Sequence, residues 1–301
     1  MSKKTLIIIQ IILWSCIIVF LSGSFAYAVI SENKKSSTDI RGGGHMLEYG
    51  VHIEDINYLE VRLVSENLYI YETGEPYIII KQIANKDIPE DEKLRVVQQG
   101  NKVKIEKRKD RGIQLFHFTN WNLNEKIEVY IPKTYNQGIN LKTVSGEIEV
   151  NNVDVKEINC KTTSGDISVE NLTAQEMNVD TTSGDIKMKK VLLDTVDSSC
   201  VSGNLEVEGI CLNIGSKTVS GNIEVELEDQ PKQIRMESVS GDIELTFAKI
   251  DGFNLEFSST SGKLKSDFEL SMEGNRQYTY NKGSAKLKIK TVSGDLEINK
   301  N

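Results

Sequence analysis

The stretch TTSGDISV (Thr162–Val169) returns nineteen residues later as TTSGDIKM (Thr181–Met188), and related stretches follow along the second half of the chain. After residue 140, Ser-Gly recurs at intervals of 18 to 21 residues, with a longer interval of 32 before the last copy. A period of this length is typical of repeat proteins, in which each unit buries its apolar face against its neighbours. The eight pairs begin at Ser145, Ser164, Ser183, Ser202, Ser220, Ser240, Ser261 and Ser293.

The residues around each Ser-Gly pair alternate in polarity. Counted from the Gly, the second residue is always Ile or Leu, the third is always polar, and the fourth is apolar in seven of the eight copies. The residue two positions before the Gly is always Val or Thr, and β-branched residues favour strands. This period-two pattern predicts strands with one buried face. Each repeat therefore contains a strand, a bend at Ser-Gly, a second strand and a short return.

The repeat predicts an all-β fold, a parallel β-solenoid (β-helix-like) of about 19-residue coils, because only stacking lets so short a unit bury its apolar face. An antiparallel sandwich is the alternative. Residues 139–301 form the predicted solenoid, and residues 47–138, which alternate without Ser-Gly, form an irregular N-terminal β cap. The insertion Phe268–Lys290 is predicted to be a hairpin whose lysines line the last open edge, where charge discourages further pairing. These lysines are Lys282, Lys286, Lys288 and Lys290.

The first 28 residues predict an N-terminal transmembrane anchor. Leu6–Ala28 is almost continuously apolar and follows Lys3 and Lys4, so the rest of the chain is expected outside the cytoplasm. A signal peptide cleaved after Ala28 is the alternative, because Ala26–Ala28 matches a small-x-small cleavage site. Residues 29–46 are polar and rich in glycine, and we interpret them as a linker.

Charge and cysteine content exclude some functions. The 301 residues carry a net charge of −8 without a basic stripe, which argues against binding to nucleic acid. Cys160, Cys200 and Cys211 have no metal-ligand spacing, and we interpret them as buried apolar residues. A single disulfide among these three cysteines stays open.

The recurring TVSGEIEV, TTSGDISV, TVSGNIEV, SVSGDIEL and TVSGDLEI, behind an apolar N-terminal segment, resemble a bacterial family. It is the putative adhesin family, domain of unknown function 4097, which includes LiaG-like envelope proteins. The resemblance covers about residues 47–301. It implies an extracytoplasmic β-repeat domain, often linked to the membrane, with no established enzyme activity.

The sequence contains no catalytic grouping that we recognise. A nucleophilic serine requires a nearby base, yet His45, His52 and His117 all precede the Ser-Gly repeats. There is no glycine-rich phosphate loop and no metalloprotease motif, so we predict no cofactor, no catalytic residue and no dedicated metal site. The expected function is a non-enzymatic adhesin or scaffold module at the cell envelope, with an unknown envelope protein or glycan as its partner. A polysaccharide-binding or polysaccharide-degrading β-helix protein is the alternative.

Two groups of residues are candidate contact sites. The residue after the repeated Gly is often acidic, and stacked carboxylates at Asp166, Asp185 and Asp242 could attract a weakly bound cation such as Ca²⁺. The simpler interpretation is that these side chains satisfy N–H groups at the bend. The aromatic residues Phe116, Phe118 and Trp121 could stack on a sugar, or could instead close the core of the cap.

Overall fold

The computed structural model describes residues 39–43, 45–107, 123–274 and 276–301, which belong to one compact unit. They form one open sheet of 22 strands with a single turn of 3₁₀ helix, so the prediction of an all-β fold is confirmed. Within these residues, no helix has the length and apolarity needed to cross a membrane. The predicted anchor, Leu6–Ala28, lies outside the described residues and stays a prediction.

The N-terminal part mixes short strands of both directions. β2 pairs with β5 and β5 with β8 in antiparallel fashion, whereas β3 pairs with β7 and β9, and β4 with β8 and β10, in parallel. The elements are β1 (Asp39–Gly43), β2 (Met46–His52), β3 (Tyr58–Arg62), β4 (Asn67–Thr73), β5 (Tyr77–Ala84), η1 (Glu90–Glu92), β6 (Leu94–Gln99), β7 (Lys102–Lys107), β8 (Glu125–Pro132) and β9 (Gly138–Lys142).

The repeated part follows with longer strands. The remaining strands are β10 (Ile148–Lys161), β11 (Ile167–Ser183), β12 (Ile186–Ser202), β13 (Leu205–Ser220), β14 (Ile223–Leu227), β15 (Gln233–Ser240), β16 (Ile243–Phe247), β17 (Phe253–Ser258), β18 (Leu264–Ser266), β19 (Ser271–Met272), β20 (Gln277–Tyr280), β21 (Ala285–Ser293) and β22 (Leu296–Lys300). The predicted boundary between residues 138 and 139 falls inside β9, which pairs with both β3 and β10, and it stays a prediction.

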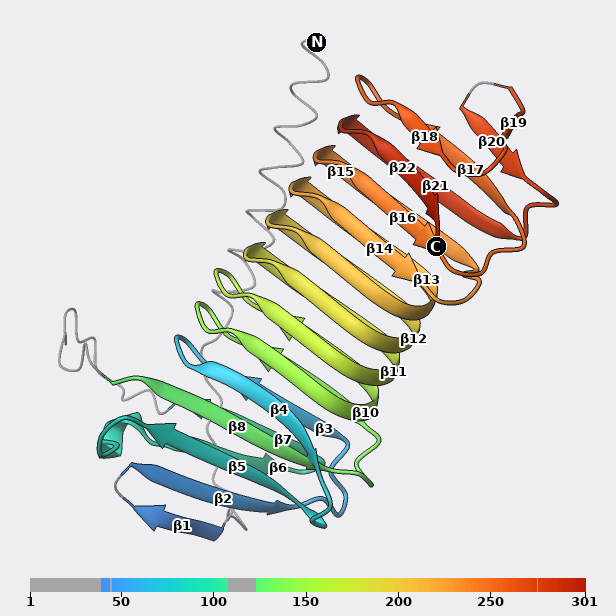
Figure 1. Ribbon diagram of the computed structural model, residues 1–301. Coiled ribbons are helices and arrows are strands. Elements are labelled where there is room, and N and C mark those ends of the chain that lie inside the picture. Colours follow the sequence, from blue (N-terminus) through green and yellow to red (C-terminus); the bar gives the residue numbers. More distant parts are fainter. Residues whose placement is uncertain (1–38, 44, 108–122, 275) are drawn as a thin grey trace. The chain divides into compact units, whose positions relative to one another are not determined.

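Successive repeats pair in parallel, each shifted by one repeat along the chain. Ile148 lies opposite Ile167, Ile167 opposite Ile186, and Ile186 opposite Leu205, so equivalent residues form columns across β10–β13. Figure 1 shows these coils following one another side by side. The residues that the sequence placed on the buried face are buried here, with Ile148, Ile167 and Ile186 at most 1% exposed. Both strands of each coil contribute to one continuous apolar core.

Each coil bends a second time, opposite its Ser-Gly corner, at a point that the sequence reasoning did not single out. Asn152, Asn171 and Lys190 have positive φ angles of 53°, 54° and 51°, and each interrupts a long strand. Asn tolerates this left-handed conformation better than most residues, whereas Lys seldom adopts it. In the following coil, the register shifts between Met188 and Val191, and Gly209, with a φ of 143°, lies opposite Val191.

The last coil in the sequence is not the last coil in the stack. β21 pairs with β15 on one side and with β17 on the other, and β22 lies between β16 and β18 in the same way. In Figure 1 the dark red β21 and β22 lie between the orange strands of the two preceding coils. The prediction that Lys286, Lys288 and Lys290 line an open edge is therefore wrong, because their strand is paired on both sides.

The insertion does contain a hairpin, in which β19 pairs with β20 in antiparallel fashion. β20 also pairs with the outer edge of β17. The terminal coil of the stack is thus Phe253–Ser266, and the hairpin covers the outer edge of β17.

Candidate functional site

The Ser-Gly corners hold neighbouring coils together at very short range. A Cβ atom built on Gly165 would overlap the carbonyl oxygen of Gly146 in the preceding coil, and the same overlap occurs at Gly184 against Gly165. Only glycine permits this approach of two backbones. The repeated Gly is therefore a packing requirement of the stack, and its recurrence needs no catalytic explanation.

The hydroxyl column before each Gly adds hydrogen bonds between the same coils. Thr162 Oγ1 donates to the carbonyl oxygen of Gly146 at 3.5 Å and accepts from the N–H of Gly165 at 3.1 Å. Cys200 occupies the same column, and its Sγ atom contacts the carbonyl oxygen of Gly184 at 3.5 Å. All three described cysteines are free and buried, and burial raises the pKa of the Cys200 thiol to about 11.

The acidic column after each Gly forms a chain of hydrogen bonds from coil to coil. Asp166 Oδ1 accepts from the N–H of Asp185 at 2.8 Å, and Asp185 Oδ1 accepts from the N–H of Asn204 at 2.7 Å. Asp242 accepts from the N–H of Asp295, also at 2.8 Å. This geometry agrees with the simpler interpretation that the side chains satisfy N–H groups at the bend, although the N–H belongs to the next coil.

The chain of hydrogen bonds follows the spatial order of the coils. Asp295 Oδ1 accepts from the N–H of Lys263, and Lys263 has no carboxylate or amide oxygen to offer a further coil. Lys263 thus marks the end of the column in the terminal coil.

The predicted cation site gains no ligand cluster from this arrangement. Across the described ranges, no group of three or more His, Cys, Asp or Glu side chains is placed to hold a metal ion. Weak cation binding by Asp166, Asp185 and Asp242 stays a prediction. Phe116, Phe118 and Trp121 lie outside the described residues, so the predicted sugar contact also stays a prediction.

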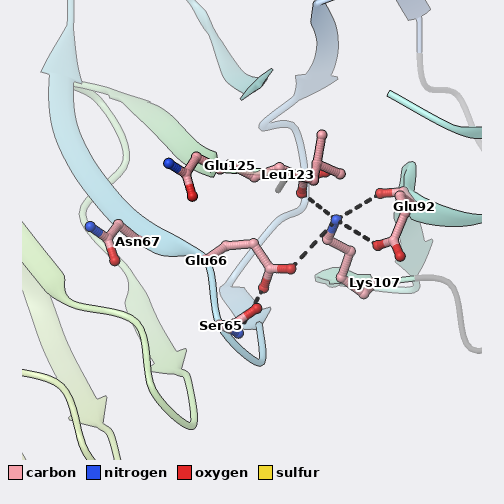
Figure 2. A pocket seen from close by; sticks show the side chains of 8 residues that line it. Ser65, Glu66, Asn67, Glu92, Lys107, Leu123 and Glu125 are labelled. Atoms are coloured by element: carbon pink, nitrogen blue, oxygen red, sulfur yellow. Dashed lines mark hydrogen bonds and ion pairs between the residues drawn. The ribbon is translucent and has the colours of Figure 1, made fainter. Parts of the chain in front are cut away.

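A polar pocket of about 570 Å³ lies among β4, β7 and the start of β8. Figure 2 shows the ammonium group of Lys107 at its centre, directed toward three glutamates. Lys107 Nζ contacts the Glu125 carboxylate, lies 3.2 Å from Glu92 Oε2 and 3.5 Å from Glu66 Oε1, and donates to the Glu92 carbonyl oxygen at 2.8 Å. The lining residues are Ser65, Glu66, Asn67, Glu92, Lys107, Leu123, Asn124 and Glu125.

In this pocket one ammonium group faces three carboxylates. Burial alone would lower the pKa of Lys107, but the hydrogen bond to Glu125 and the charges of Glu66, Glu125 and Glu92 outweigh it and raise that pKa. Burial raises the pKa of Glu125, and the ammonium of Lys107 offsets only part of that effect. Among the described residues that line the pocket there is no histidine, and Ser65 supplies the one side-chain hydroxyl. The arrangement fits an internal ion pair better than a nucleophile with its base.

A row of tyrosines on the outer face of β4 and β8 was not anticipated from the sequence. The rings of Tyr69 and Tyr71 are nearly parallel with centroids 6.4 Å apart, and the centroids of Tyr71 and Tyr130 are 5.5 Å apart. Lys126 lies 5.9 Å from the Tyr69 centroid and Lys81 lies 4.8 Å from that of Tyr130. The three tyrosines thus lie beside one another and beside two lysines. The alternation in LYIYE (Leu68–Glu72) was the available signal.

A family model describes most of the chain. The model named Toastrack DUF4097 matches residues 56–299. The chain belongs to this family. The match confirms the resemblance stated from the repeated motifs. A comparison with curated protein sequences returned no match.

A comparison with solved structures returned several matches. A putative adhesin from Bacteroides fragilis is 16% identical, with 89% of this chain and 100% of that chain covered and a TM-score of 0.48. A putative lipid binding protein from Parabacteroides distasonis is 17% identical, with 87% and 98% covered and a TM-score of 0.46. A putative cell adhesion protein from Clostridium sporogenes is 14% identical, with 86% and 100% covered and a TM-score of 0.30.

Proposed function

We propose that this DUF4097 protein is a non-enzymatic parallel β-solenoid that serves as an adhesin or scaffold module at the bacterial cell envelope. The observation that supports it is the use of the repeated polar groups. At the Ser-Gly corners, the Thr hydroxyls and the Asp and Asn side chains form hydrogen bonds between coils. The repeat chemistry is thus engaged in holding the stack together, and the outward sheet faces are the surface offered to a partner.

We further propose that the solenoid lies outside the cytoplasm, held by a single membrane span formed by Leu6–Ala28. Its support is the apolar run behind Lys3 and Lys4. Secretion after cleavage behind Ala28 is the alternative. The partner is an envelope protein or a glycan reached from this tether.

Protease accessibility in the native cells tests the location. Proteinase added to intact cells should remove a C-terminal epitope, and the uncleaved chain should stay with the membrane during alkaline extraction. Appearance of the chain in the medium, beginning after Ala28, would support secretion instead. An epitope that is protected until the cells are lysed would contradict both.

Chemical crosslinking of the chain in those cells tests the role. We expect capture of a specific envelope protein or glycan that is lost when the β-repeat domain is replaced by an unrelated one. Turnover of cell-wall or host polysaccharide by the purified chain would overturn the non-enzymatic assignment.

A further inference from the structure

In the C-terminal coils, the first strand after each Ser-Gly corner carries glutamates that stack from coil to coil. Glu206, Glu224, Glu244 and Glu297 occupy one column across β13, β14, β16 and β22, because each is the register partner of the next. Glu208 and Glu226 form a second column beside it. We call these six residues the acidic face.

The second strands of the same coils carry mainly lysine and arginine. Arg235 lies opposite Lys288, and Glu237 lies between Lys217 and Lys290 in the register of β13, β15 and β21. We call Lys217, Arg235, Lys286, Lys288 and Lys290 the basic face. Both strands of a coil bury their apolar residues in one core, so the acidic and basic faces point away from it in opposite directions.

Some of these charges are already paired within the chain. Lys189 lies 3.0 Å from Glu206 and 3.6 Å from Glu208, and Lys288 lies 2.7 Å from Glu256. Arg235 lies 2.9 Å from Glu237.

Other charges on the two faces have no ion pair among the described residues. On the acidic face, Glu244 and Glu226 accept only amide hydrogen bonds, from Asn299 and Asn301, and Glu224 has no side-chain partner. On the basic face, Lys217, Lys286 and Lys290 are exposed and have no ion pair with a described residue, although the charges of Lys217 and Lys290 help to lower the pKa of Glu237.

We infer that the acidic face of one copy docks against the basic face of a second copy of this chain. A second copy of the chain is complementary in charge to both the acidic face and the basic face. An anionic polymer would explain the basic face alone, and the net charge of −8 would oppose its approach. The two faces also share one strand spacing of about 4.8 Å, so charged columns of equal pitch meet when two copies stack. The inference goes beyond the envelope role and does not depend on a membrane anchor.

The contact joins two different patches, so a pair of copies keeps one free acidic face and one free basic face. Contacts of this heterologous type propagate from copy to copy rather than closing as a dimer. Because surface ion pairs are weak and screened by salt, the association is expected to be modest and sensitive to ionic strength.

Sedimentation velocity of the full chain in mild detergent tests the contact. We expect reversible association at high protein concentration in about 0.15 M salt, weakened at least tenfold in about 1 M salt. Glu224→Lys with Glu244→Lys, and separately Lys286→Glu with Lys290→Glu, should each abolish self-association. An equimolar mixture of these two variants should restore association, because the intact basic face of the first variant can dock on the intact acidic face of the second.

A matched control carries the same change in charge elsewhere. Asp154→Lys with Asp194→Lys alters two exposed positions outside both faces and should leave association unchanged. Circular dichroism on each variant confirms folding. A wild type that stays monomeric under all conditions would overturn the inference, as would association that survives either double variant. Binding of polyphosphate to a monomeric wild type, lost in Lys286→Glu with Lys290→Glu, would replace a second copy by an anionic polymer.

Discussion

At the scale of single residues, the repeated glycine is the residue on which the stack depends most. A Cβ at Gly165 would collide with a backbone carbonyl, which cannot turn aside as a flexible side chain can. The sequence showed that Gly recurs and that the chain bends there. It could not show that the carbonyl in contact belongs to another coil, because that contact is formed only when the coils stack.

We predict that Gly165→Ala lowers the free energy of unfolding by about 2–3 kcal/mol, because the added methyl overpacks the contact with Gly146. Gly74→Ala is the matched control, since a Cβ there meets nothing within 4 Å, and it should change stability by less than about 0.5 kcal/mol. Urea denaturation of both variants measures the difference. Equal stability of the two variants would contradict the account of the corners.

The contribution of Glu60 to the stability of the protein is expected to depend on pH. Its side chain is 2% exposed and lies 2.5 Å from Arg62 and 2.9 Å from Lys102. Burial alone would raise the pKa of Glu60, but the hydrogen bonds and charges of these two cations outweigh it and hold the pKa below its ordinary value of 4.5. The lowered pKa contributes stability that is complete above about pH 4.5 and is lost as the pH falls through the pKa of the folded state.

Glu60→Gln should therefore cost about 2 kcal/mol of unfolding free energy at pH 7, since Arg62 and Lys102 lose their anionic partner. The gap from the wild type should close as both proteins are titrated from pH 6 to pH 3. Glu75→Gln, at an exposed position, serves as the control. A gap that stays constant across this range would show that the charge of Glu60 contributes nothing.

At the scale of elements, the strands and their parallel register follow closely from the repeat. Columns such as Ile148, Ile167 and Ile186 are apolar at a fixed offset, and only in-register stacking buries all of them together. The second corner was missed because Asn152 and Asn171 give way to Lys190 in the next coil, and only the positive φ angles at these positions reveal the corner. The polar pocket around Lys107 joins strands that are distant in the sequence, so no local pattern announces it.

The hydrogen bonds that the acidic column forms between coils are expected to contribute to stability. Asp185→Ala should cost about 1 kcal/mol, because the N–H of Asn204 loses its acceptor. Asp185→Asn should be nearly neutral, since Asn204 already accepts an N–H from the next coil in the same way. Thermal melts of the two variants distinguish them, and equal losses would contradict the hydrogen-bond role.

The same melts test the predicted cation site. Millimolar Ca²⁺ that raises the melting temperature of the wild type, but not of Asp185→Asn, would support a bound cation. No shift in either protein would remove that prediction.

At the scale of the whole described unit, the order of the coils determines which charges meet on its outer faces. Glu297 extends the acidic column, and Lys290 joins the basic face, only because β21 and β22 lie between the two preceding coils. The sequence carried two hints of this order, the 32-residue interval before Ser293 and a lysine where other coils have an acceptor. Neither hint was sufficient to predict the order of the coils, since the sequences around Ser261 and Ser293 are similar. Only the pairing of distant strands shows that Ser293, and not Ser261, lies beside Ser240.

Disulfide crosslinking in the Ser-Gly column tests this order most directly. Ser240 is the register partner of Ser293, within reach of a disulfide, whereas Ser261 lies two strands from Ser240. Under mild oxidation, Ser240→Cys with Ser293→Cys should crosslink as efficiently as Ser220→Cys with Ser240→Cys, whose residues are also register partners. Ser240→Cys with Ser261→Cys should stay reduced. Efficient crosslinking between 240 and 261, with none between 240 and 293, would show that the coils follow the order of the sequence and would contradict the account.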